Sequence, residues 1–113
     1  MDYLKYFKYK YRKNENNCWE FVRYVYKEEH NIELPLLPIM DSLQAECKTF
    51  LQCNIKHNVV NEAKKGILIH VWSGDREHIG YALDNKKYMH LKDKGVRVDD
   101  IPKRCLKYEV IND

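Results

Sequence analysis

Cys18 is the residue whose position most favours chemistry, because the sequence predicts it in the first turn of a helix. Apolar residues recur from this point at intervals of three and four and form one helical face: Cys18, Phe21, Val22, Val25 and Tyr26. Unpaired backbone N–H groups and the positive end of the helix dipole favour a thiolate there. With a neighbouring imidazole, such a site lowers a thiol pKa from about 8.5 into the range of about 3.5 to 7.5. The alternative is a small apolar residue on the buried face, and the position of Cys18 alone leaves both open.

The helix that begins at Cys18 has signals at both ends. Asn17 is a suitable N-cap, and Glu20 falls at the reciprocal position of a capping box. Pro35 and Pro38 cannot continue the helix, so we expect it to end near His30.

The rest of the chain predicts an α+β fold. A second helix is expected from Asp41 or Ser42 to about Asn54. Runs rich in β-favouring residues then predict strands at 67–72, 78–83, 86–91, 95–98 and 106–110. Asp84 and Asn85 form a hairpin signal between the second and third of these. We therefore expect one domain over 1–113, with the N-terminal helix packed on an antiparallel meander sheet.

Length and charge exclude several classes of protein. The 113 residues suit a single domain, and the formal charge of +3 is too small and too dispersed to indicate a nucleic-acid partner. No stretch approaches the roughly 20 apolar residues of a membrane span, and the N-terminus lacks the apolar region of a signal peptide. The expectation is a soluble protein made in the cytoplasm.

The four cysteines are sparse and irregularly spaced, which predicts free thiols and no disulfide. Cys47, Cys53 and His57 lack the paired C-x-x-C spacing of a zinc site. Cys47 also falls on the apolar stripe of the second predicted helix, so we expect no metal.

Two segments in the same order carry a family resemblance. The first is the predicted helix that a cysteine opens, residues 17–26, with Leu34 and Pro35 following a few residues after it. His78-Ile79-Gly80 then begins a strand that turns at a polar pair and returns to His90, twelve positions on. Together these segments resemble the nucleophile helix and catalytic hairpin of NlpC-type cell-wall cysteine peptidases over roughly residues 17 to 100. The chain departs from the usual pattern in having Asn17 and Trp19 beside the cysteine and no Gly-rich loop before it.

The resemblance implies a role for each member of a Cys-His-His triad. Cys18 would be the nucleophile, His78 the general base that later acts as acid, and His90 the residue that orients His78. This suits the chemistry, because a thiol needs an imidazole within reach and that imidazole needs a partner to fix its tautomer. Of the other histidines, His30 and His57 are expected to be solvated, and His70 lies inside an apolar strand.

The resemblance also implies a papain-like core and a hydrolase of peptidoglycan stem peptides, commonly at the bond between D-glutamyl and a diamino acid. Tyr9, Tyr11 and Trp19 are candidates for contacts with the oxyanion or the substrate, although the two tyrosines suit aromatic cover over the sheet equally well. Acyl transfer of this kind requires neither a metal nor an organic cofactor.

Trp19 resembles a feature of bacteriophage tail-associated members of the family. This favours delivery within a virion or by lysis, with tail or other virion proteins as partners and the bacterial cell wall as the place of action. Two other functions stay open: an inactive relative that serves as a structural or tail-assembly protein, and a cytoplasmic amidase or acyltransferase with the same dyad.

The hairpin gives a geometric prediction. A two-residue turn at Asp84-Asn85 would set Ile79 opposite His90 and turn His78 to the other face. We therefore expect an odd-length loop or a bulge between residues 78 and 90, with both imidazoles facing the N-terminus of the Cys18 helix.

Overall fold

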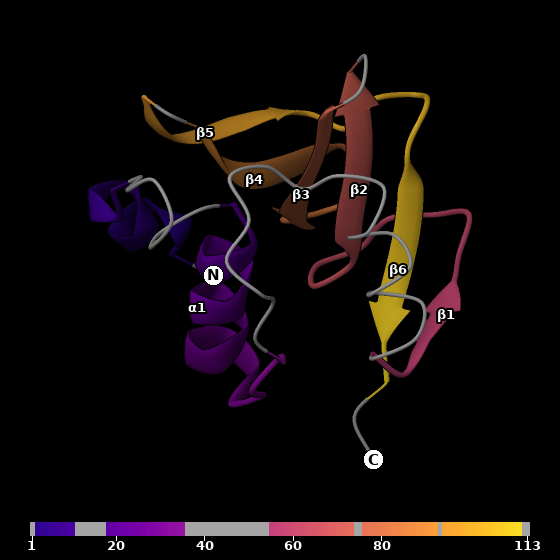
Figure 1. The fold of residues 1–113 in the computed structure, drawn as a ribbon, viewed down its shortest axis with the longest axis horizontal. Coiled ribbons are helices and arrows are strands. Elements are labelled where there is room, and N and C mark those ends of the chain that lie inside the picture. The colour runs from indigo at the N-terminus through magenta and orange to yellow at the C-terminus, as the bar shows by residue number, and fades with distance from the viewer. Residues whose placement is uncertain (1, 11–17, 36–54, 74–75, 93, 112–113) are drawn as a thin grey trace.

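The computed structural model describes residues 2–10, 18–35, 55–73, 76–92 and 94–111, with only the backbone for 72–73 and 76–77. Two helical segments precede six strands (Figure 1). Their bounds are η1 Tyr3–Lys8, α1 Cys18–His30, β1 His57–Val59, β2 Leu68–Ser73, β3 Arg76–Ala82, β4 Lys87–Lys92, β5 Gly95–Asp100 and β6 Leu106–Val110.

The strands form one antiparallel sheet in the order β1-β6-β2-β3-β4-β5. Strands β2 to β5 follow one another as a meander, which confirms that part of the prediction, and β6 returns to pair with β2 at the other side. Together with α1, this is the α+β architecture expected from the sequence. Figure 1 shows α1 beside the part of the sheet formed by β3 and β4.

Helix α1 begins at Cys18 among the described residues and ends at His30, as predicted. Asn31 follows in the left-handed conformation with φ 55, which asparagine tolerates better than most residues. The backbone N–H of Asn31 bonds to Lys27 O at 3.1 Å, and that of Ile32 bonds to Tyr26 O at 3.4 Å. The first of these bonds is that of an αL cap, and the two together satisfy carbonyls of the last turn and end the helix before Pro35.

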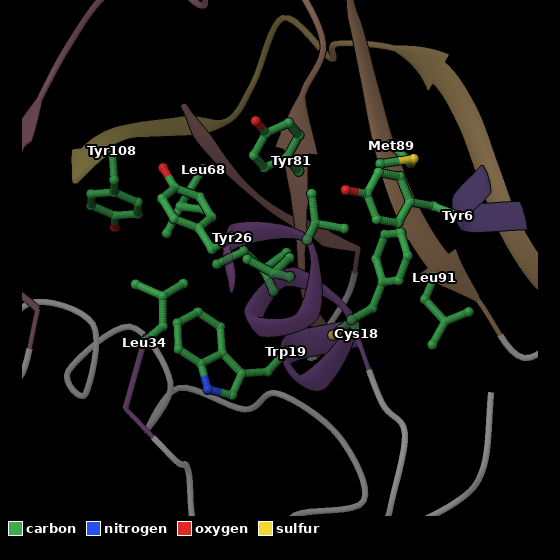
Figure 2. Close-up of a cluster of buried hydrophobic side chains, with 14 of the residues drawn as sticks. Tyr6, Cys18, Trp19, Tyr26, Leu34, Leu68, Tyr81, Met89, Leu91 and Tyr108 are labelled. Carbon is green, nitrogen blue, oxygen red and sulfur yellow. The ribbon is translucent and has the colours of Figure 1, made fainter. Parts of the chain in front are cut away.

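The two faces of the sheet differ in what covers them. One, called here the helix face, packs its apolar side chains on α1; they include Leu68, Ile79, Tyr81, Met89 and Leu91. Figure 2 shows several of these side chains gathered around the helix. The other, called the far face, holds a smaller cluster of Ala63, Ile67, Ile69, Ala82 and Tyr88. Side chains alternate between these faces along each strand.

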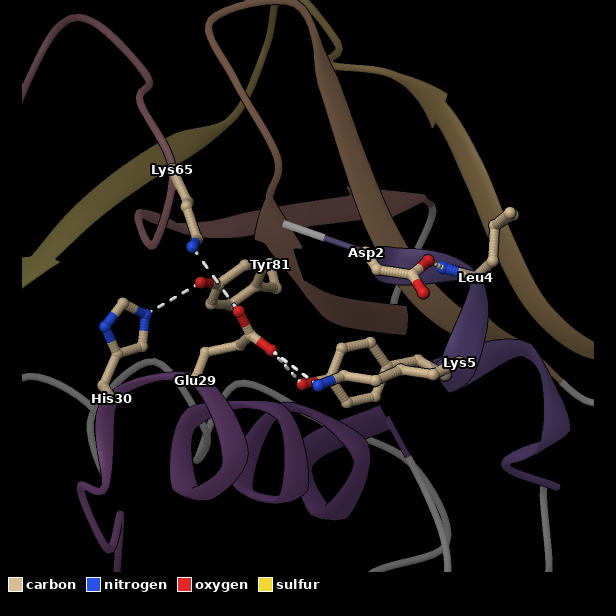
Figure 3. Close-up of polar contacts among 8 residues, drawn as sticks. Asp2, Leu4, Lys5, Glu29, His30, Lys65 and Tyr81 are labelled. Atoms are coloured by element: carbon tan, nitrogen blue, oxygen red, sulfur yellow. Dashed lines mark hydrogen bonds and ion pairs between the residues drawn. The ribbon is translucent and has the colours of Figure 1, made fainter.

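Glu29 joins the N-terminal segment to the rest of the domain (Figure 3). Its carboxylate accepts a hydrogen bond from the hydroxyl of Tyr6, a residue that is buried in η1. Lys5 Nζ lies 3.3 Å away and Lys65 Nζ 3.4 Å away. We call these four residues the Glu29 network.

His30 is not the solvated side chain that the sequence predicted. It is partly buried, lies against the ring of Tyr26 and makes a 2.8 Å hydrogen bond with the hydroxyl of Tyr81. Burial and the charge of Lys65 lower the pKa of His30. The imidazole therefore completes the packing at the C-terminal end of α1.

Several predictions fall outside the described residues, among them the Asn17 cap, the second helix and the two cysteines Cys47 and Cys53. Conversely, η1 and the short strand β1 were not predicted. Among the described residues, no helix combines the length and apolar character needed to cross a membrane.

Candidate active site

Cys18 occupies the first turn of α1, as predicted, and is 8 % exposed. Figure 2 shows it within the buried cluster that also contains Met89 and Leu91. A backbone hydrogen bond from Ile79 on β3 reaches the thiol. Because Ile79 directly follows His78, the sulfur lies against the backbone next to the predicted base.

The electrostatic state of Cys18 corresponds to the second alternative left open by the sequence, a small residue on the buried face. Burial raises the pKa of its thiol to about 11, and the backbone hydrogen bonds from Ile79 and the first turn offset only part of that shift. Removing a thiolate from water costs more here than the helix end returns. The sulfur is therefore protonated at neutral pH in this structure, whereas the position in the helix had suggested a thiolate.

The hairpin between β3 and β4 has an odd-length loop, as predicted. Tyr81 pairs with Met89 and Ala82 with Tyr88, while Leu83 N bonds to Lys87 O at 2.9 Å. Residues 84–86 therefore form the connection. The carboxylate of Asp84 stabilises this turn by accepting hydrogen bonds from the backbone N–H groups of residues 86 and 87.

This register places His78 and His90 on the same face of the sheet. His78 Nε2 lies 2.7 Å from His90 Nδ1, within hydrogen-bond distance. The ring centroids are 4.8 Å apart and the planes are nearly perpendicular, at 74°. The sheet thus brings together two side chains that are twelve positions apart in the sequence.

The face that carries the two histidines is not the predicted one. Ile79 pairs with His70 on the helix face, so its neighbour His78 points to the far face. Met89 and Leu91 likewise pack on the helix side, which turns His90 away from it. The large apolar residues of both strands occupy the space beneath α1, so the imidazoles lie across the strand from the Cys18 thiol. The expectation that they face the helix N-terminus is therefore wrong in this structure.

His78 is held in its neutral form. Burial lowers its pKa to about 3, and the electrostatic effects of His90 and Lys92 act in the same direction. At neutral pH the ring therefore has one unprotonated nitrogen, which a general base requires.

Asp99 extends the histidine pair and was not singled out from the sequence. Its Oδ2 lies 2.7 Å from His90 Nε2. Strand β5 sets Asp99 opposite Tyr88, whose ring stacks on His90 at 4.4 Å and 11°. Gly80 leaves room for that ring, because a Cβ there would come within 2.6 Å of Tyr88 Cδ2. Alternation had predicted this strand only over 95–98, short of Asp99, and the register of β5 identifies Asp99 as a partner.

The three candidates for substrate contacts fall in different places. Trp19 is fully buried and donates its indole N–H to Pro35 O at 2.9 Å, so it belongs to the core. Tyr9 is half-buried against Phe21 and Tyr24. This packing is the aromatic cover left open from the sequence, although here it covers α1 and not the sheet. Tyr11 lies outside the described residues.

The remaining histidines and the two described cysteines make the following contacts. His57 is partly buried and its Nδ1 lies 2.5 Å from Ile55 O, while His70 is buried in β2. Cys18 and Cys105 are both free thiols. Within the described part of the chain, no group of three His, Cys, Asp or Glu side chains could hold a metal ion.

Comparison with known proteins gives a family for this arrangement. The model of the NlpC/P60 family matches residues 5–113, which is nearly the whole chain. A search of curated proteins found no match. Members of this family are usually cysteine peptidases or amidases of the cell wall, which agrees with a cysteine at a helix start and a histidine pair on adjacent strands. The chain belongs to the NlpC/P60 family.

Proposed function

We propose that this protein cleaves peptidoglycan stem peptides by acyl transfer, with Cys18 as the nucleophile, His78 as the base and His90 as its orienting partner. The observation that carries the proposal is the 2.7 Å contact between His78 Nε2 and His90 Nδ1. The thiol lies against the backbone of the residue next to His78. Family membership supports the cell wall as the source of the substrate.

The reaction would proceed in two balanced steps. Cys18 Sγ attacks the amide carbonyl and forms a C–S bond, while its proton passes to His78. The C–N bond then breaks as His78 returns that proton to the leaving amine. In the second step a water molecule attacks the thioester, its proton passes through His78 to the departing thiolate, and the acid product leaves. Backbone N–H groups at the start of α1 suit stabilisation of the oxyanion.

The neutral resting state sets the order of proton transfer. Burial favours the neutral form of both Cys18 and His78, so neither is charged before the reaction at neutral pH. A thiolate and an imidazolium formed together attract each other, which offsets part of the cost of burying each charge. Proton transfer should therefore accompany attack, and it requires a rearrangement that brings Cys18 and His78 together, because their side chains lie on opposite sides of β3 in this structure.

The burial of Cys18 also favours one competing function, an inactive relative that uses the fold in an assembly such as a phage tail. Delivery in a virion is a further part of our proposal and rests on the sequence resemblance alone. An active enzyme should digest peptidoglycan and lose that activity in a Cys18 variant, whereas a structural relative should show no digestion at all.

The test is digestion of purified peptidoglycan, with the released muropeptides identified by mass spectrometry. Cys18→Ala should reduce product to background, while the matched Cys105→Ala variant should retain parental activity, because Cys105 Sγ donates a hydrogen bond to Pro102 O in the loop between β5 and β6. Circular dichroism establishes that equal amounts of folded protein are compared. If the parent released no new stem-peptide ends, or if Cys18→Ala matched the parent, the proposal would be wrong. Products formed only with an added acceptor amine would indicate an acyltransferase.

A further inference from the structure

His78, His90 and Asp99 form a continuous chain across three neighbouring strands of the far face. His78 on β3 meets His90 on β4 at 2.7 Å, and His90 meets Asp99 on β5 at 2.7 Å. His90 uses a different ring nitrogen for each of its two contacts. The chain therefore has a direction, which the hydrogen-bonding capacity of its last member determines.

Asp99 is ionised at neutral pH, because the hydrogen bond from His90 lowers the pKa of its carboxyl group. An ionised carboxylate only accepts hydrogen bonds, so the proton between Asp99 and His90 must lie on His90 Nε2. A neutral His90 then has an unprotonated Nδ1. That nitrogen can only accept, so His78 must donate from its own Nε2.

This assignment leaves one nitrogen of His78 unprotonated, namely Nδ1. The ring of His90 is also held in place by its surroundings. Its side chain is 2 % exposed, and the ring of Tyr88 stacks on it. Fixing the ring on one side by a carboxylate and on one face by an aromatic ring restricts it to a single orientation.

Other charged groups near His90 do not replace Asp99. Arg97 and Lys92 are cations and lower the pKa of His90, whereas Asp99 raises it. Arg97 Nε lies 3.5 Å from Asp99 Oδ2, farther than the 2.7 Å of the His90 contact, and its side chain is 59 % exposed. An ion pair of that kind contributes little, so the main partner of Asp99 is His90.

We propose that Asp99 is a positioning residue that acts through His90 to fix the tautomer of His78, so that Nδ1 is the ring nitrogen of His78 left free to accept a proton. This inference rests on the proposed function for its catalytic consequence, but the tautomers themselves exist in the resting protein. Asp99 thereby joins the two histidines inferred from the sequence in one hydrogen-bonded chain.

The first test needs no substrate. Long-range ¹H–¹⁵N spectra of the parent at neutral pH distinguish protonated from unprotonated ring nitrogens. Both His78 and His90 should carry the proton on Nε2. A neutral His78 protonated on Nδ1 would overturn the inference, whatever the protein does to peptidoglycan.

The second test compares Asp99→Ala with Asp100→Ala, which removes the same charge from the next residue. Asp100 is exposed and pairs with Lys87, so it serves as a matched control. Asp99→Ala should give mixed tautomers for both histidines and lower kcat by roughly 10- to 100-fold, as loss of a group that orients a ligand or base does elsewhere. KM should change little, because Asp99 acts through His90 and not on the substrate.

Asp99→Asn sharpens this comparison, because its amide oxygen can still accept from His90 without the charge. It should retain more of the Nε2-protonated form, and more activity, than Asp99→Ala. Equal tautomers and equal kcat in Asp99→Ala and the parent would overturn the positioning role. Predicted tautomers in a parent without hydrolytic activity would instead contradict the proposed function and leave the hydrogen-bond assignment standing.

Discussion

The Glu29 network and the chain from His78 to Asp99 both join a carboxylate to ring-bearing side chains, but their bonds are arranged differently. Glu29 collects donors from Tyr6, Lys5 and Lys65 at a single carboxylate. In the chain, two imidazoles stand in series and the carboxylate lies at one end. The Glu29 network fixes the positions of the elements that supply its donors. The chain from His78 to Asp99 instead determines which ring nitrogen carries a proton.

The two regions also differ in how their surroundings shift the pKa of the titratable side chain. Glu29 lies beside the ammonium groups of Lys5 and Lys65. The hydrogen bond from Tyr6 lowers the pKa of its carboxyl group. His78 instead combines burial with positive neighbours, so its pKa falls and its free nitrogen stays unprotonated. The first arrangement stabilises a charge and the second prevents one. We therefore expect substitutions in the Glu29 network to change stability, and substitutions in the chain from His78 to Asp99 to change turnover.

The largest expected effect is on catalysis. His78→Ala should lower hydrolysis by roughly 10²- to 10⁴-fold, because it removes both the base and the acid for the leaving amine. The midpoint of thermal unfolding should shift little, since the side chain that is removed is only partly buried. Glu29→Gln at the same folded concentration should keep the parental rate. A similar loss of rate in both variants would show that the two regions are not functionally distinct.

Next in size is the difference between two substitutions of His90. An amide can hold His78 by accepting its Nε2–H, as asparagine does in papain-like triads, so His90→Asn should stay within about tenfold of the parent. His90→Ala removes the acceptor and should lose more. The measured quantity is kcat for both variants on the same muropeptide. If His90→Asn were as inactive as His78→Ala, His90 would take a more direct part than orientation.

Substitutions in the Glu29 network should change stability and leave catalysis unchanged. Glu29→Ala leaves the buried Tyr6 hydroxyl without this acceptor, which should reduce the free energy of unfolding by about 1–3 kcal/mol. Urea titration measures the change. Glu33→Ala is the control, because Glu33 is 78 % exposed and pairs with Lys27 at 3.5 Å, so its loss should stay within about 0.5 kcal/mol. Equal effects would mean that the network contributes no more than a surface ion pair.

The smallest effect is a pH dependence of stability. The pKa of Glu29 is lower in the folded protein than the unfolded value of about 4.3, so its ionisation stabilises the fold fully above that pH. The contribution is lost as the pH falls through the lower, folded pKa. The stability difference between parent and Glu29→Gln should therefore shrink on acidification below about pH 4. A difference that is constant with pH would contradict the assigned pKa direction.

The sequence predicted those elements whose pattern is local. Strand β6 has the predicted bounds, 106–110, and α1 ends at His30, because alternation and proline positions are visible along the chain. The strand β1 was missed because its His57-Asn58-Val59 segment is short, largely exposed and has no apolar alternation. The segment η1 was missed for a similar reason, since it buries only Tyr6.

The site was predictable only as far as spacing carries information. The interval between His78 and His90 required an odd-length loop for the rings to share a face, and that prediction is confirmed. Which face they share depends on the large apolar residues that alternate with them, and the partner role of Asp99 depends on the register of β5. The raised pKa of Cys18 comes from burial by distant segments, which a helix position cannot reveal.

The most direct test of the account is covalent labelling by a stem-peptide analogue that carries a chloromethyl ketone in place of the scissile amide. Peptide mapping by mass spectrometry then locates the modified residue. We predict one adduct, on Cys18, whose formation slows in His78→Ala and is suppressed by competing muropeptide, while Cys105 stays unmodified. Labelling of another cysteine at an equal rate, or labelling of Cys18 that muropeptide does not suppress, would contradict the assignment of Cys18 as the nucleophile.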